Sequence, residues 1–83
     1  MSDTINRLAA KLAEDTLQAM DETGEDRLYV EVGGVLAAAS QSLEEAFLTE
    51  VRVRLAERKA RAFLNARLGR ARAAGAAPQD PGA

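Results

Sequence analysis

Residues 26–73 read DRLYVEVGGVLAAASQSLEEAFLTEVRVRLAERKARAFLNARLGRARA, and one apolar stripe runs through them. The stripe starts at Leu28 and reaches Val53, and its members recur three, four or seven positions apart with no proline between them. That recurrence is typical of an amphipathic α-helix. The sequence therefore predicts an all-α fold, a small helical hairpin or three-helix domain.

A break within this stretch is expected from its length. One helix over residues 26–73 would be about 70 Å long at 1.5 Å per residue, which is far beyond the usual globular length. Two sites could hold the break: the glycine pair at residues 33–34, and residues 40–42, where Ser42 and Glu45 would form a capping box. We favour the break at residues 40–42.

A further amphipathic helix precedes this stretch. Ser2, Asp3 or Thr4 can cap its start, and Gly24 can take the left-handed conformation that ends a helix. The sequence predicts one helical domain over residues 1–74, with helices at about residues 4–21, 26–39 and 42–73. Residues 75–83 hold small residues and two prolines, so we expect a disordered tail there.

The segment LYVEV at residues 28–32 admits a second interpretation. Its β-branched and aromatic residues, followed by two glycines, could form a short strand that ends in a turn. The helical stripe continues across it in register, which favours a helix. A strand there would instead allow a ribbon-helix-helix dimer that pairs its strands and presents Arg27 and Glu31 to a DNA groove.

The chain is small for an independent domain. It has 83 residues and no cysteine, so it buries a modest fraction of its surface and has neither disulfides nor thiolate metal sites to stabilise it. Burial against a partner is the simplest remaining source of stability. We therefore expect assembly into a homodimeric helical bundle, since two-fold dimers are the commonest soluble assemblies.

From Leu43 onward, apolar residues occupy two sides of the expected helix, which implies two neighbours. One side carries Leu48, Val51, Leu55 and Ala62, and the other carries Val53, Ala60, Leu64 and Leu68. One neighbour would be the N-terminal helix of the same chain and the second would be another copy. The proposed interaction residues are Leu48, Val51, Leu55 and Ala62 with Arg54, Arg58 and Arg61.

Charge is divided unevenly along the chain. Residues 1–50 hold eleven acids and three bases, a balance of −8, whereas residues 51–83 hold eight bases and two acids, a balance of +6. An antiparallel hairpin would set these halves side by side as exposed ion pairs, and this is the favoured explanation. A basic surface for phosphate or for an acidic protein is the alternative.

Catalysis is not expected. The chain has no histidine and no cysteine, and its serines have no evident base within reach in the sequence. Adjacent acids such as Glu44 and Glu45 are usually solvated, and residues 33–34 lack the spacing of a phosphate-binding loop. The sequence therefore predicts no enzyme activity, no cofactor and no metal site.

The partners expected are a second copy of the chain and another protein. The N-terminal residues lack the pattern of a signal peptide, and no apolar run of roughly 18 residues could span a bilayer, so we expect a cytoplasmic protein without a membrane partner. The leading hypothesis is a non-enzymatic interaction module that acts as a regulator or adaptor. The alternative is a small dimeric nucleic-acid-binding regulator, ribbon-helix-helix-like or antitoxin-like, that uses the basic half.

Overall fold

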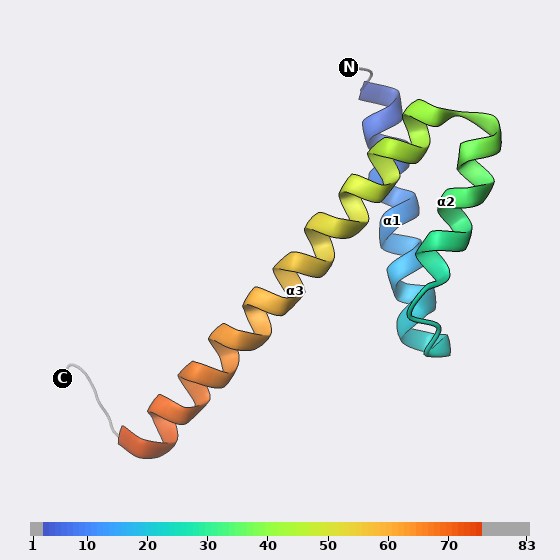
Figure 1. Cartoon of the computed structure of the whole chain (residues 1–83). Helices are drawn as coiled ribbons and strands as arrows, with labels where there is room; N and C mark the ends of the chain where they lie inside the picture. Colours follow the sequence, from blue (N-terminus) through green and yellow to red (C-terminus); the bar gives the residue numbers. More distant parts are fainter. Residues whose placement is uncertain (1–2, 76–83) are drawn as a thin grey trace.

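The computed structural model describes residues 3–75, which form three α-helices (Figure 1). The helix α1 spans Asp3–Thr23, α2 spans Leu28–Ala39 and α3 spans Gln41–Gly75. No strand occurs among these residues, so the all-α prediction is confirmed and residues 28–32 are helical. The paired strand of a ribbon-helix-helix dimer is therefore not formed in this structure. The tail expected at residues 75–83 lies outside the described residues except for Gly75, which ends α3.

Helices α1 and α2 form a hairpin, and a tight turn joins them. Gly24 takes the left-handed conformation that the sequence predicts, with φ +77°, and its N–H donates to the Met20 carbonyl over 2.8 Å. The Thr23 hydroxyl donates to the Ala19 carbonyl and accepts from the Glu25 N–H. These bonds satisfy backbone groups at the end of α1, so the chain can reverse within residues 24–27.

Ser40 separates α2 from α3. Its backbone is extended, with φ −157° and ψ 106°, and its N–H donates to the Leu36 carbonyl over 2.7 Å. Its side-chain oxygen accepts a hydrogen bond from the Leu43 N–H at 3.2 Å. The break predicted at residues 40–42 is confirmed, but Ser40 caps α3 in place of the predicted Ser42.

The core lies where α3 crosses the hairpin. Its buried apolar side chains are Ala9, Ala13 and Leu17 of α1 with Phe47 and Val51 of α3. The small alanines of α1 allow the two helices to approach closely. On the other side, α2 brings the buried Gly33 against α3, where a Cβ at residue 33 would lie 3.3 Å from the Leu48 side chain. Glycine at this position therefore permits the close contact. The glycine pair at residues 33–34, the other candidate for the helix break, lies within α2.

The second half of α3 extends beyond the hairpin (Figure 1). Every residue from 56 to 75 is exposed, and the last ion pair to α1 is made by Arg58. We call residues 59–75 the overhang; they would span about 25 Å at 1.5 Å per residue. The radius of gyration is 18.1 Å, against roughly 11 to 12 Å for a compact domain of this length. The molecule is thus elongated along α3.

Candidate functional site

The side of α3 that the sequence proposed for interaction is largely turned toward its own hairpin. Val51 is fully buried, and Leu48 and Leu55 are partly buried against the core. Val51 is therefore unavailable to a partner while the helices remain packed. Ala62 continues the same side of α3 beyond the hairpin and is exposed.

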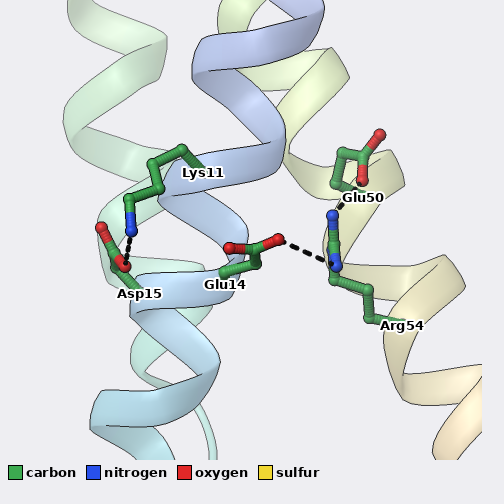
Figure 2. A network of polar contacts seen from close by, with 5 residues as sticks. All are labelled: Lys11, Glu14, Asp15, Glu50 and Arg54. Carbon is green, nitrogen blue, oxygen red and sulfur yellow. Dashed lines mark hydrogen bonds and ion pairs between the residues drawn. The ribbon is translucent and has the colours of Figure 1, made fainter.

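The three proposed arginines are all engaged within the chain. Arg54 donates to Glu50 at 3.0 Å and lies 3.7 Å from a carboxylate oxygen of Glu14, and Lys11 pairs with Asp15, the residue next to Glu14 on α1 (Figure 2). The Arg54 Nε is buried and has no hydrogen-bond partner among the described residues. Arg54 thus bridges α3 and α1 at the edge of the core.

The other two arginines pair at the surface. Arg58 holds Asp21 with two hydrogen bonds of 3.0 and 3.1 Å, and Arg61 holds Glu57 at 2.7 Å. Exposed pairs of this kind contribute up to about 1 kcal/mol each. The predicted pairing of acidic and basic halves is therefore present at Arg54 and Arg58, which join α3 to α1. These pairs help to set the direction of α3.

A groove of about 550 Å³ lies beside these pairs. It is lined by Glu14, Leu17, Glu50, Val53, Arg54, Glu57 and Arg58. Each charged residue that lines the groove already has a partner within the chain: Arg54 pairs with Glu14 and Glu50, Arg58 with Asp21, and Glu57 with Arg61. Ligand recognition here would have to break existing ion pairs.

The other side of α3 is open to solvent. Val53 is 61% exposed, and farther along the helix Phe63, Leu64 and Leu68 are 63%, 53% and 41% exposed. At 100° per residue, Val53 and Leu64 lie roughly opposite the buried Val51. The helix α3 therefore has one apolar side packed on the hairpin, which includes the proposed residues Leu48, Val51 and Leu55, and another that is open to solvent.

Unpaired cations border this exposed side. Lys59, Arg70 and Arg72 make no ion pair within residues 3–75, and the sequence has no acid from residue 58 to residue 75. The guanidinium of Arg67 lies over the Phe63 ring, 5.4 Å from its centroid, a cation–π contact. We define the overhang face as the apolar residues Ala60, Phe63, Leu64, Leu68 and Ala71 with the cations Lys59, Arg67 and Arg70.

The sequence-based prediction assigns no role to Phe63. The available signal was its spacing from Arg67, because side chains four residues apart meet on one side of a helix.

Within the described residues, no group of three or more acids could hold a metal ion. No helix in this part of the chain is long and apolar enough to cross a membrane.

Comparison with known proteins identifies no relative. No protein-family model matches this chain. No curated protein matches its sequence, and no solved structure matches its fold.

Proposed function

We propose that this chain is a non-enzymatic helical interaction module that acts as a regulator or adaptor of a partner protein and binds through the overhang face. One observation carries the proposal: every residue of α3 from 56 to 75 is exposed, and the large apolar side chains Phe63, Leu64 and Leu68 are among them. A contiguous apolar surface on a small protein commonly marks an interaction site.

The pattern of the overhang face indicates how a partner would bind. Ala60, Leu64, Leu68 and Ala71 form one row along the helix, the spacing with which an amphipathic helix enters an apolar groove. Phe63 widens the row on one side. Lys59, Arg67 and Arg70 lie on this same side, so they favour a partner surface that is apolar where it meets the row and acidic along that edge.

Affinity capture from an extract of the producing cells, followed by mass spectrometry, tests this proposal. The bait variant replaces Phe63, Leu64 and Leu68 with alanine, which removes apolar surface and keeps helix propensity high. Leu8→Ala is the matched control, because Leu8 is 56% exposed on α1, away from the overhang. We expect one or more proteins that bind the unchanged chain and Leu8→Ala but not the triple variant. Capture of the same proteins by all three baits would contradict the proposal.

A nucleic-acid regulator is the second candidate, and the charge of the overhang favours it. Residues 59–75 carry five bases and no acid, which suits phosphate contacts. The exposed Phe63, Leu64 and Leu68 favour a protein partner more strongly, because phosphate contacts need no apolar row. If binding to duplex DNA is lost when the salt concentration is raised to the physiological level, the result supports the protein-interaction module. Binding that persists there at one sequence would support the second.

A further inference from the structure

The chain has a second uncovered apolar surface, on the outer side of α2. Val35 is 73% exposed and Val30 is 43% exposed, and Gly34, Ala37 and Ala38 between and beside them are also exposed. Within Leu28–Ala39 the one charged residue is Glu31. A helix that is apolar nearly all round is normally covered on all sides, so α2 lacks a neighbour on its outer side.

The two uncovered surfaces carry opposite charge. Residues 22–45, which contain α2, hold six acids and one base, a balance of −5. Residues 59–75 hold five bases and no acid, a balance of +5. Around α2, Glu25 and Glu31 make no ion pair among the described residues. The acidic surface around α2 and the basic overhang are therefore complementary in charge.

These surfaces cannot meet within one molecule. The helix α3 is continuous over Gln41–Gly75 and runs away from α2 along its whole second half (Figure 1). Folding the overhang back onto α2 would require a break in α3, and no proline occurs between residues 41 and 75 to favour one. Contact between them therefore requires a second molecule.

We infer that the overhang face of one copy docks on the outer side of α2 of a second copy, and that a two-fold axis repeats the contact to give a homodimer. The lengths agree, because α2 spans about 18 Å and the row from Ala60 to Ala71 spans about 17 Å at 1.5 Å per residue. Gly34 on one side and Ala60 on the other allow the helices to approach closely. The inference rests on one premise of the proposed function, that the overhang face is a binding surface, and it names a second copy of the chain as the occupant.

Pairing of the overhang of one copy with the overhang of a second copy is a poorer solution. It would bring the five bases of one overhang against the five bases of the other, and like charges in an interface cost several kcal/mol. Docking on α2 replaces that repulsion with attraction. It also covers Val35 and Val30, which pairing of the two overhangs would leave exposed.

Charge exchange between the two surfaces tests the inference. The first variant combines Arg67→Glu with Arg70→Glu, and the second combines Glu25→Lys with Glu31→Lys. By sedimentation equilibrium at micromolar concentration, the unchanged chain should show twice the monomer mass, and each variant alone should self-associate at least about tenfold more weakly. An equimolar mixture should recover the dimer, because both contacts of a mixed dimer again join opposite charges.

One control and one further test accompany the charge exchange. Lys11→Glu with Asp15→Lys reverses an ion pair on α1 without removing it and should leave the dimer unchanged. Val35→Asp alters the outer side of α2 without touching the core and should abolish the dimer. Far-UV circular dichroism of each variant verifies that it is helical before its mass is compared.

Several results would overturn the inference: a monomeric unchanged chain, two weakened variants whose mixture does not recover, or a dimer that tolerates Val35→Asp. Binding of the monomer to vesicles that contain an anionic lipid, without dimer formation, would do the same. A monomeric chain whose overhang face still captures a protein would refute the dimer and leave the proposed function standing. A charge-exchangeable dimer that captures no protein would support the dimer and refute the proposed function.

Discussion

The two phenylalanines of the chain occupy opposite environments. Phe47 is fully buried where α3 crosses α1, and it is the largest side chain in the core. Phe63 is 63% exposed and touches the guanidinium of Arg67. Phe47 therefore stabilises the packing of the chain, whereas Phe63 is accessible to a partner.

Replacing each phenylalanine with alanine should separate these roles. Phe47→Ala should cost about 3 to 5 kcal/mol, because it leaves a cavity at the helix crossing. That loss is comparable to the total stability of a domain this small, about 5 kcal/mol, so the variant should be largely unfolded. Phe63→Ala should change stability by less than about 0.5 kcal/mol. Urea denaturation followed by circular dichroism, at the lowest practical protein concentration, measures the stability of both variants. Equal losses of stability would contradict the assignment of Phe47 to the core and Phe63 to the surface.

The adjacent glycines of α2 also differ in their surroundings. A side chain at residue 33 would meet Leu48, whereas nothing lies within 4 Å of a Cβ at residue 34. We expect Gly33→Leu to destabilise the chain by about 1 to 3 kcal/mol through overpacking. Gly34→Ala, its matched control, should add about 0.5 to 1 kcal/mol through helix propensity. Equal stability of Gly33→Leu and the unchanged chain would show that α2 does not pack on α3 at this point.

Local patterns in the sequence were sufficient to predict the helices and the break between α2 and α3. Apolar spacing and the lack of proline specify a helix over Gln41–Gly75, and serine chemistry specifies the region of the break. The inward side of α3 could not be predicted in this way. Val51 and Val53 are both valines on a two-sided helix, and only the crossing with α1 decides which is buried. The arginine pairings depend on the same crossing, since Arg58 and Asp21 are 37 residues apart.

The overhang should be the least stable part of α3. All of its residues are exposed, and isolated helices of its length are marginal in water. Gly69 lies within it, with nothing within 4 Å of a Cβ placed there, so Gly69→Ala should favour the helix by about 1 kcal/mol. Hydrogen exchange in the monomer should show slower exchange at residues near 69 in this variant and unchanged exchange in the core. No gain in protection near residue 69 would indicate that another contact already holds the overhang.

The two halves of the continuous helix α3 differ in their surroundings: the first half contributes to the core and the second half is exposed. All buried apolar side chains of the described residues lie between Ala9 and Val51, so the folding core ends well before the overhang begins. The longest dimension, 56 Å, reflects a helix that far exceeds what the core requires. We therefore expect that folding does not require this extension and that its exposed apolar side chains are accessible to a partner.

Truncation after Lys59 tests this division for the whole chain. The shortened protein keeps the core and the pairing of Arg58 with Asp21, and the new end of α3 carries Arg58 and Lys59, where bases complement the helix dipole. Its melting temperature at low concentration should lie within about 5 °C of that of the full chain, equivalent to roughly 1 kcal/mol or less.

The concentration dependence of melting should distinguish the two proteins. If the full chain dimerises through the overhang, its melting temperature rises with protein concentration by mass action, whereas that of the truncated chain stays constant. A chain that lacks only residues 76–83 is the control, because it retains all of α3 and should follow the full chain. A truncated protein that is unfolded, or that melts with the same concentration dependence as the full chain, would show that residues 60–75 stabilise the hairpin or that association occurs elsewhere on the molecule.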